Sequence, residues 1–444
     1  MRKMFFTLIS IAAFLSVCTC EAPLATAQSA GSASAGSGTA ELREVNSEGQ
    51  KKLTEAQIAA LTGLQTGSQV GREDLQKAAD KLVASGLFAT VKYDFKTRAE
   101  GLTLSFHVTE SPRVPAYYDN FPWFGDSELN DAIRAQLPFF DGTLPEGGNV
   151  VEFASDAIHT LLRSHNLDLA VQHQVVANPL ADGNIQQFSV QGAALQIASL
   201  SFSDAALATN PAVQQHLSEI NGKPYSRTTI EVFLAEQIRP VYLKQGYLQA
   251  KVGPPEVQLS GPPTAKLPEQ LPVFVPIVAG DIYKVGDLQW SGNNVVSSIA
   301  LDSYFGLKAG AVADGMEIEA ALDRIREEYG RRGYLDAAVQ PVTSFNEAAH
   351  TVSYRIAIVE GGQYHMGGWV ITGVSTNGEA KVRATFPIAA GDVFDKAKYE
   401  DFLTKLQAHS KDVFGDLPIH YEGVGHWLRA DAAKMTVDVL LDFK

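Results

Sequence analysis

Residues 72–95, REDLQKAADKLVASGLFATVKYDF, place a helix, a glycine and a strand in direct succession. From Arg72 to Ser85 the apolar residues recur at intervals of three and four, which predicts an amphipathic helix with one buried face. Gly86 ends this helix, because glycine can adopt the left-handed conformation of a C-terminal cap without a Cβ clash. The segment from Leu87 to Phe95 has the β-branched and aromatic composition of a strand. We therefore expect a helix that turns directly into a strand.

The same arrangement recurs along the chain. Five long helical segments end at a residue able to take the left-handed conformation, and these residues are Gly86, Asn166, Gly246, Gly333 and Gly415. Asparagine follows glycine in its tolerance of that conformation, and the pattern is weaker at Asn166 and weakest at Gly415. Because the capping positions are spaced by roughly equal intervals, the sequence predicts a structural repeat of about 80 residues.

Each repeat has the same predicted order of elements. A strand, clearest at Lys284–Ser291, precedes a short helix, the long capped helix and a hairpin of two strands, clearest at Leu335–Thr343 and Thr351–Val359. This β-α-α-β-β order predicts an α+β fold, in which each module is a three-stranded mixed sheet with two helices on one face. The expected boundaries are a signal peptide at 1–27, a flexible linker at 28–43, and five repeats at 44–111, 112–192, 193–279, 280–360 and 361–444.

The first residues have the composition of a secretory signal. Arg2 and Lys3 precede an apolar run from Met4 to Val17, and small residues at 25–27 favour cleavage before Gln28. The run is shorter than the roughly 20 residues that span a bilayer, although a membrane anchor and a lipid attached at Cys18 or Cys20 are alternatives. The stretch that follows, QSAGSASAGSGTA, has the composition of a flexible tether. The sequence therefore predicts export to the periplasm.

Composition excludes several classes of function. The formal net charge is −14, and nucleic-acid binding proteins depend on lysine and arginine, so we expect no nucleic-acid partner. Both cysteines lie in the predicted signal, which leaves the expected mature chain without a disulfide or a cysteine-bound metal. With 45% apolar and 19% charged residues, the rest of the chain has the composition of a folding protein.

The repeat carries a family resemblance in its junctions. The motifs that carry it are Tyr283–Leu288 (YKVGDL) with Gly292-Asn293, the junctions Gly246-Tyr247-Leu248 and Gly333-Tyr334-Leu335, the segment 85–91 (SGLFATV), and Val359–Tyr364 (VEGGQY) with Glu360 and Gly361. Together they resemble the tandem polypeptide-transport-associated (POTRA) domains of the outer-membrane β-barrel assembly family. The resemblance covers about residues 44–443 and is strongest from about 280 to 373. The second and fifth repeats depart from it, because neither has an aromatic residue just after the cap.

The resemblance implies a structural role outside the cytoplasm. In that family such repeats precede a membrane-embedded barrel, and the smallest barrel needs about eight further strands, so we expect a relative without the barrel. It implies a periplasmic scaffold, peripheral to the outer membrane at most, that binds unfolded outer-membrane proteins or a separately encoded β-barrel protein. A scaffold of a secretion or cell-division complex is the alternative. An enzymatic role is not expected.

The edge strand after each capped helix is the expected binding element, because it presents unpaired N–H and C=O groups to another extended chain. Proline lacks the N–H donor, so Pro254 and Pro255 in the third repeat and Pro341 in the fourth should blunt their edges. The first and second repeats offer edges without proline. The predicted peptide-binding residues are Val91, Lys92, Tyr93 and Asp94 in the first, and Ala170, Val171, Gln172 and His173 in the second.

Catalytic and metal-binding patterns are not found in the sequence. The histidines include no HExxH motif, and His159, His165 and His173 are spaced by six and eight residues, which does not place them on one helix face. We therefore predict no catalytic residue, no metal and no cofactor. The segment 117–124 (YYDNFPWF) has two interpretations, a binding platform of aromatic rings or a strand and loop packed into the core.

Overall fold

The structure is a computed structural model, and it describes residues 28–29, 39–259, 270–408, 410–415, 417 and 421–444. The predicted signal peptide lies outside the described residues. The chain divides into two compact units, the first built mainly from residues up to Gln196 and the second mainly from Ile197 onward. Within the described residues no helix has the length and hydropathy needed to span a membrane.

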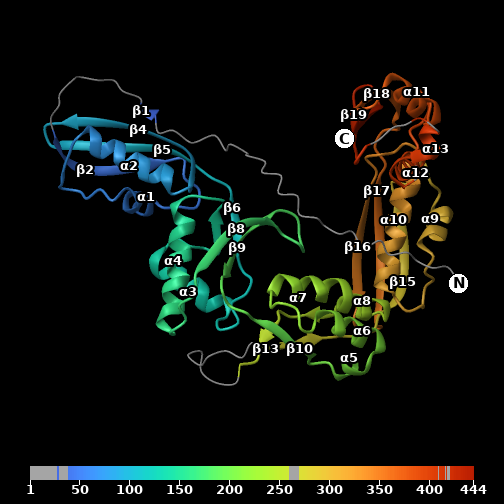
Figure 1. Cartoon of the computed structure of the whole chain (residues 1–444), viewed down its shortest axis with the longest axis horizontal. Coiled ribbons are helices and arrows are strands. Elements are labelled where there is room, and N and C mark those ends of the chain that lie inside the picture. The colour runs from blue at the N-terminus through green and yellow to red at the C-terminus, as the bar shows by residue number, and fades with distance from the viewer. Residues whose placement is uncertain (1–27, 30–38, 260–269, 409, 416, 418–420) are drawn as a thin grey trace. The chain divides into compact units, whose positions relative to one another are not determined.

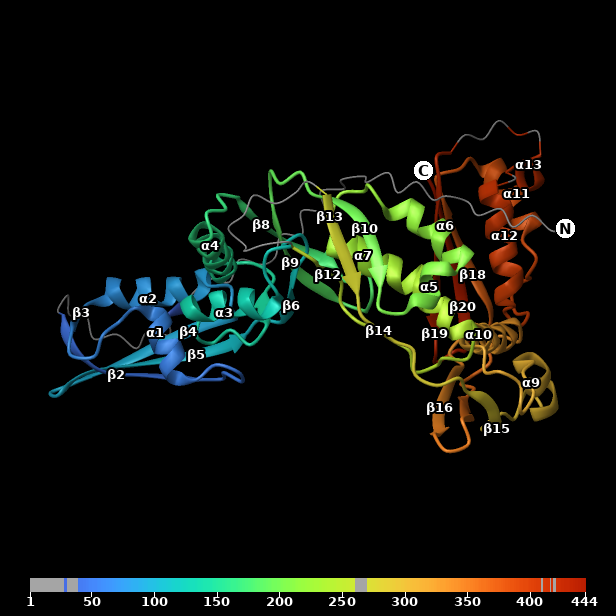
Figure 2. The ribbon, with the colours of Figure 1, turned by 90° about the horizontal axis from the view of Figure 1, so that it is seen from below.

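One strand order recurs in the sheets, and this order confirms the expected α+β fold. In four repeats the first strand pairs in parallel with the third, and the second strand pairs antiparallel with the third. The third strand therefore lies between the other two, and the strand that follows the long helix lies on the side of it away from the first strand (Figures 1 and 2). The second and fifth repeats, whose sequences depart most from the pattern, share this order. In the second, fourth and fifth repeats the strand that follows the long helix is the last of its sheet. In the first repeat the short strand β1 lies beyond it.

The first repeat begins earlier than expected. Its strand β2 starts at Ala40, inside the segment expected to be linker, because Leu42 is fully buried and belongs to the core. Two short strands extend the predicted three-stranded sheet to five, in the order β1-β4-β5-β2-β3. Its elements are β1 (Gln28–Ser29), β2 (Ala40–Glu48), α1 (Glu55–Thr62), β3 (Gln69–Val70), α2 (Arg72–Ala84), β4 (Phe88–Arg98) and β5 (Gly101–Glu110).

The second repeat has a four-stranded sheet in the order β7-β6-β9-β8. One continuous hydrophobic core joins it to the first repeat. At the junction a Cβ on Gly86 would lie 1.8 Å from the carbonyl oxygen of Gly147, so only glycine allows this approach. The elements of the repeat are β6 (Arg113–Tyr118), α3 (Asp126–Gln136), β7 (Thr143–Pro145), α4 (Asn149–Ser164), β8 (Val171–Ala177) and β9 (Asn184–Val190).

The aromatic segment 117–124 packs into this core. Tyr118, Phe121, Trp123 and Phe124 are each less than 10% exposed, and the rings of Tyr118 and Phe121 meet edge to face at 6.1 Å between centroids. Burial of four of these side chains favours the core interpretation over a surface platform.

In the third repeat the long helix expected before Gly246 is not continuous. The helix is divided into α7 (Arg227–Phe233), a π-helical turn at Leu234–Ile238 and α8 (Arg239–Lys244). Pro240 supplies the cause, because a proline inside a helix removes a backbone donor and clashes with the preceding turn. The other elements are β10 (Gln196–Phe202), α5 (Ala205–Thr209), α6 (Pro211–Ile220), β11 (Lys251–Val252), β12 (Glu256–Val257), β13 (Gln270–Val275) and β14 (Ile277–Val278).

The fourth and fifth repeats are the most alike, and each has its own hydrophobic core. Their first strands shift register at matching places, Val285/Leu288 and Met366/Trp369. The elements of the fourth are β15 (Lys284–Ser291), α9 (Ser298–Phe305), α10 (Gly315–Arg331), β16 (Ala338–Asn346) and β17 (Thr351–Val359). Those of the fifth are β18 (His365–Thr372), α11 (Thr376–Thr385), α12 (Lys396–Ala408), α13 (Ser410–Phe414), β19 (Val424–Asp431) and β20 (Thr436–Phe443).

All five capping residues have positive φ, as expected from the sequence, with Asn166 at 59° and Gly333 at 82°. After α10, the amide of Tyr334 donates to the carbonyl of Tyr329 at 3.0 Å, which is the 6→1 bond of a Schellman cap. The two rings meet edge to face at 6.2 Å between centroids. Tyr247 and Tyr242 repeat both contacts after α8. The glycine–tyrosine motif is therefore a helix cap closed by an aromatic pair.

Glu360 ties the end of one repeat to its first loop. Its Oε1 accepts hydrogen bonds from the amide of Val295 at 2.7 Å and from the Tyr329 hydroxyl at 2.9 Å. The loop begins at Gly292, where a Cβ would lie 2.2 Å from the carbonyl oxygen of Ile358, and Asn293 donates to Val296. Gly361 follows with φ of 71°. These motif residues therefore fix the turn between the first strand and the first helix.

Candidate functional site

Strand β4 carries the first group of predicted binding residues. It pairs antiparallel with β5, so that Lys92 lies opposite His107 and Tyr93 opposite Phe106. The side chains alternate: Val91 and Tyr93 are buried, whereas Lys92 is exposed on the face that the helices leave free. The Tyr93 hydroxyl donates to Gln76 of α2 at 3.0 Å. Lys92 thus lies on the free face of this outer part of the sheet.

The edge of β4 is not entirely open. Strand β1 pairs with it in parallel, with Gln28 beside Lys92 and Ser29 beside Tyr93. Two positions of the predicted binding edge are therefore already paired with residues of the chain itself. The pairing also shows that the β4 edge accepts a further strand.

Strand β8 carries the second group. It pairs antiparallel with β9, with Gln172 opposite Ser189 and His173 opposite Phe188, and it is the last strand in the order of its sheet. Ala170 precedes the strand, and its carbonyl accepts a hydrogen bond from Gln191 at 2.9 Å. Within the described residues β8 pairs with β9 alone, so no described strand covers its outer side.

His173 lies on the side of β8 that faces the long helix. Its Nε2 lies 3.2 Å from the Glu152 carboxylate of α4, and its Nδ1 lies 3.2 Å from the side-chain amide of Gln186. The bonds fit the tautomer in which Nε2 donates to Glu152 and Nδ1 accepts from Gln186. Gln186 is fully buried, and its Oε1 has no hydrogen-bond partner among the described residues. The inner side of this edge is therefore polar as well as apolar.

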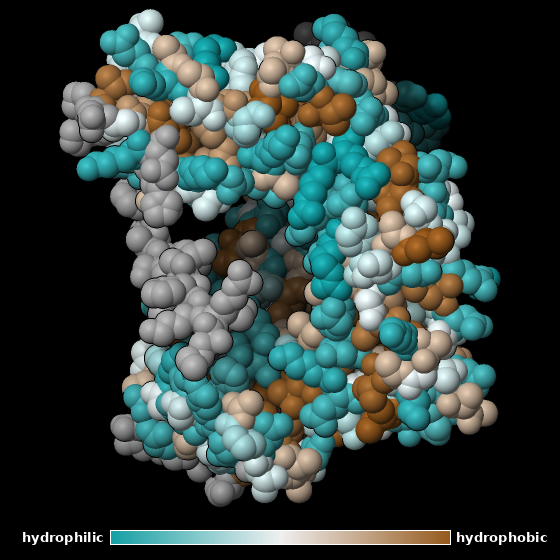
Figure 3. Space-filling model, turned by 90° about the vertical axis from the view of Figure 1, so that its right-hand side faces the viewer, coloured by the Kyte–Doolittle hydropathy of each residue, from teal (hydrophilic) through white to brown (hydrophobic). Residues whose placement is uncertain are grey.

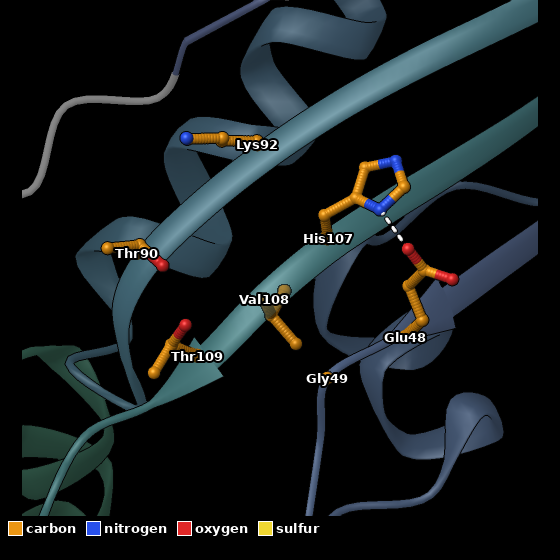
Figure 4. A pocket seen from close by; sticks show the side chains of 7 residues that line it. All are labelled: Glu48, Gly49, Thr90, Lys92, His107, Val108 and Thr109. Atoms are coloured by element: carbon orange, nitrogen blue, oxygen red, sulfur yellow. Dashed lines mark hydrogen bonds and ion pairs between the residues drawn. The ribbon is translucent and has the colours of Figure 1, made fainter.

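A hollow of about 470 Å³ lies beside β4 on the helix-free face of the first sheet (Figure 4). Its floor comes from three adjacent strands, so that it crosses from the sheet interior to the β4 edge. The residues that line it are Glu48, Gly49, Thr90, Lys92, His107, Val108 and Thr109. A strand that pairs with β4 would place alternate side chains toward this hollow.

His107 joins the three strands at this hollow. Its Nδ1 lies 2.5 Å from Glu48 of β2, and its Nε2 lies 2.6 Å from Asp94 of β4. The hydrogen bond to Asp94, followed by that to Glu48, raises the pKa of His107 above its ordinary value of 6.5. When it is protonated, the imidazole bridges two carboxylates and joins β4 to β2 across the central strand.

Glu48 and His107 were not among the residues predicted from the sequence. The signal that could have found them is the register, because a histidine in the central strand of a β-α-α-β-β sheet has cross-strand neighbours on both sides. That register depends on strand ends and bulges, which the sequence pattern places to within a few residues.

The described residues contain no group of three or more histidine, cysteine, aspartate or glutamate side chains that could hold a metal ion. Strands β4 and β8 offer backbone hydrogen-bonding groups and apolar side chains. Beside β4 there is also the cluster of His107 with Glu48 and Asp94. This chemistry suits the binding of an extended polypeptide.

One of the repeats matches a known protein family. Residues 283–361 match the POTRA family, described as a surface antigen variable number repeat. The match covers β15 through β17 and ends at Gly361. The fourth repeat is therefore similar to a POTRA domain. The matched stretch is the one in which the sequence resemblance is strongest.

A curated protein is similar in sequence to part of this chain. A putative outer membrane protein assembly factor of Treponema pallidum is 24% identical over 254 residues, and the match covers 55% of this chain. This chain matches 30% of the length of that curated relative.

Solved structures of BamA and Omp85 fragments are also similar to parts of this chain. The POTRA3-5 fragment of Haemophilus influenzae BamA is 20% identical with a TM-score of 0.43, and the match covers 56% of this chain and 96% of the fragment. The N-terminal domain of Omp85 from Thermosynechococcus elongatus is 13% identical with a TM-score of 0.18, and the match covers 72% of this chain and 97% of that one.

Proposed function

We propose that this protein is a non-enzymatic periplasmic scaffold that binds unfolded or partner polypeptides by strand addition in outer-membrane protein assembly or translocation. The observation that carries the proposal is the pair of strands β4 and β8, each of which follows a capped helix: β8 is the last strand of its sheet, and the two-residue strand β1 alone lies beyond β4. An added strand gains main-chain hydrogen bonds whatever its sequence, which suits a protein with many clients. The name of the assembly-factor relative supports the process in which the scaffold acts.

The chemistry of the two edges supports weak and reversible binding. Each net backbone hydrogen bond contributes about 1 kcal/mol, so a strand of a few residues gains affinity without becoming permanent. At β8 the half-buried Val171 and Val175 offer apolar contact beside His173. A client strand of alternating apolar and polar residues, as in a barrel protein, would match both kinds of contact.

The test is binding of a labelled ten-residue peptide that alternates apolar and polar residues, measured by fluorescence anisotropy with the full chain. Lys92→Pro and Gln172→Pro each remove a backbone donor from the ladder that holds the edge strand to its neighbour, and so disrupt the strand that a guest would join, whereas Lys92→Ala and Gln172→Ala keep that donor. Measured in a chain whose other edge already carries proline, each proline substitution should weaken binding by at least about fivefold, the cost of about one hydrogen bond, and the alanine variants should bind as the parent does.

Two further measurements guard this result. Hydrogen exchange of the first and second repeats identifies a proline variant that has lost its sheet. Photocrosslinking in the periplasm from a benzoylphenylalanine at position 92 or 172, followed by mass spectrometry, identifies the client. Equal binding by folded proline and alanine variants, together with no crosslink to a polypeptide, would exclude strand addition at these edges.

A further inference from the structure

Strand β8 presents backbone groups to its outer side at alternate residues. At one end of the β8–β9 ladder the amide of Gln191 donates to the carbonyl of Ala170 at 2.9 Å. At the other end the amide of Asn178 donates to the carbonyl of Gly183, also at 2.9 Å. Because bonded and non-bonded pairs alternate along an antiparallel ladder, the even-numbered residues between these ends bond to β9. The residues with outward N–H and C=O groups are therefore Val171, His173, Val175 and Ala177.

The first of these outward positions already has a partner within the repeat. The carbonyl of Val171 accepts a hydrogen bond of 3.3 Å from the hydroxyl of Ser155, a buried residue of α4. A guest strand would compete with this bond at Val171, but not at the outward positions that follow. We therefore expect a guest strand to pair along residues 173–177 of β8.

The inner side of β8 has more hydrogen-bond acceptors than donors at this end. Nε2 of His173 lies 3.2 Å from Oε1 of Glu152, and Nδ1 lies 3.2 Å from the side-chain nitrogen of Gln186. Both ring nitrogens of His173 are thus engaged. The Oε1 atom of the fully buried Gln186 has no hydrogen-bond partner among the described residues. The Glu152 side chain is 66% exposed, so its carboxylate can accept further hydrogen bonds.

We propose that Glu152 selects guest strands that place a lysine or arginine side chain beside His173. This inference rests on the proposed function, since it concerns which polypeptides the β8 edge prefers. Directly opposite residues of paired strands have Cβ atoms about 5 Å apart, so a long guest side chain opposite His173 reaches the carboxylate that His173 contacts. An ammonium or guanidinium group supplies the donors that this side of the strand lacks.

The other charges along α4 agree with this selection. Asp156 is exposed one turn after Glu152 and carries the same charge. The basic side chains lie toward the other end of the helix, where Arg163 and His159 are 4.0 and 3.8 Å from Asp168, ahead of β8. The end of β8 that should take the guest therefore faces carboxylates. A guest carboxylate there would meet like charge, so acidic side chains should be rejected as basic ones are preferred.

Glu152 also lies in the first turn of α4, where a carboxylate stabilises the helix. Loss of that stabilisation would change the affinity for every guest strand by the same factor. Selection by charge changes the ratio of affinities between two guests instead. The ratio is therefore the quantity to measure.

The experiment compares two ten-residue alternating peptides that differ at one central apolar position, which carries lysine in one and glutamate in the other. Fluorescence anisotropy is measured with the full chain carrying Lys92→Pro, so that β8 is the edge measured. We expect the lysine peptide to bind about three- to tenfold more tightly. Glu152→Gln should bring this ratio close to one, and Glu152→Lys should invert it. Asp182→Lys, on the exposed turn between β8 and β9, makes the same change in net charge and should leave the ratio unchanged.

The outcomes separate this inference from the proposed function. A ratio near one in the parent chain, or a ratio that Glu152→Gln does not alter, would overturn selection by Glu152. Strand addition at β8 would still stand if Gln172→Pro, added to the same chain, weakened the binding of both peptides. Binding that Gln172→Pro does not weaken would instead count against strand addition at β8 itself. Hydrogen exchange of the second repeat identifies a variant that has not folded, and Glu152→Gln provides the test if Glu152→Lys does not fold.

Discussion

The carbonyl oxygen of Gly333 accepts a hydrogen bond of 2.8 Å from the amide of Tyr364, and this bond joins the cap of one repeat to the first strand of the next. The carbonyl of Tyr364 in turn accepts from the amide of Phe394 at 3.0 Å. Gly246 and Tyr283 form the same junction one repeat earlier, at 2.9 Å. The capping glycine therefore has two tasks, to end its own helix and to receive the following repeat.

Gly333→Ala should destabilise this junction more than a matched glycine substitution does. At Gly333, with φ of 82°, an added Cβ would lie 2.8 Å from the Tyr364 oxygen and from Val393 Cγ1. At Gly310, with φ of 80°, it would meet no atom within 4 Å. Gly310→Ala should cost about 1 kcal/mol for the left-handed backbone, and Gly333→Ala about 1–3 kcal/mol more. Hydrogen exchange of the fourth and fifth repeats gives both values, and equal costs would contradict a role of Gly333 in the junction.

Glu360 and Tyr329 should act as a coupled pair. The hydroxyl of fully buried Tyr329 donates to Glu360, and burial followed by this bond raises the pKa of Tyr329. Glu360→Gln and Tyr329→Phe should each cost about 1–2 kcal/mol, with a coupling of at least about 0.5 kcal/mol in the double variant. Glu317→Gln, in an exposed ion pair with Arg324, should cost less than about 1 kcal/mol. Hydrogen exchange of the fourth repeat measures these values, and strict additivity would show that the pair is not coupled.

Glu110 shows that the same anchoring occurs in the first repeat. Its Oε1 accepts from three successive amides, those of Lys51, Lys52 and Leu53. Burial alone would raise the pKa of Glu110, but the three amide bonds outweigh it and lower the pKa. Glu360 holds the corresponding position in the fourth repeat. In both repeats the glutamate accepts from amides of the first loop, which lies beside it only in the folded chain.

The parts of the fold that local chemistry determines were predictable from the sequence. Left-handed caps at Gly86 and Asn166 and the strands Lys284–Ser291 and Thr351–Val359 depend on neighbouring residues, and the structure has them. The start of β2 at Ala40 was missed, because Leu42 becomes a core residue only through packing against the helices. The π-helical turn before Pro240 was missed because the apolar spacing alone was considered.

The candidate site was harder to predict, because it depends on contacts between distant residues. The outer positions of β4 and β8 followed from the repeat. The bridge from His107 to Asp94 and Glu48 required the register of three strands. The pairing of Gln28 with Lys92 joins residues far apart in the sequence, and no local pattern indicates it.

His107 makes the stability of the first repeat depend on pH. Because its pKa is raised in the folded state, protonated His107 stabilises the fold, and this contribution is complete below the unfolded pKa of about 6.5. It is lost as the pH rises through the raised pKa of the folded state. Urea unfolding followed by hydrogen exchange of the first repeat should therefore show a fall in stability across that range. His107→Gln should flatten this dependence, and a variant as steep as the parent chain would rule out the bridge as its cause.

Pro341 should limit the binding of a further strand at the edge of β16. Strand β16 continues through Pro341, which lies opposite Ile356. The strand is otherwise a suitable edge, since Val342 is 55% and Phe345 37% exposed on it. Hydrophobic patches on the side shown in Figure 3 are small and separated by hydrophilic side chains. A continuous ladder beside β17 implies that the missing donor of Pro341 faces outward.

Pro341→Val should therefore open a third binding edge. The test uses the full chain with Lys92→Pro and Gln172→Pro, in which the proposed edges are blocked and the alternating peptide binds weakly. Addition of Pro341→Val restores one outward donor beside Val342 and Phe345, and we expect affinity to rise by about fivefold, the value of roughly one hydrogen bond. Ser344→Val is the control, because it adds a β-branched side chain to the same strand without adding a donor. An equal rise in both variants would attribute the gain to hydrophobic contact, and no rise in either would show that proline does not limit binding at this edge.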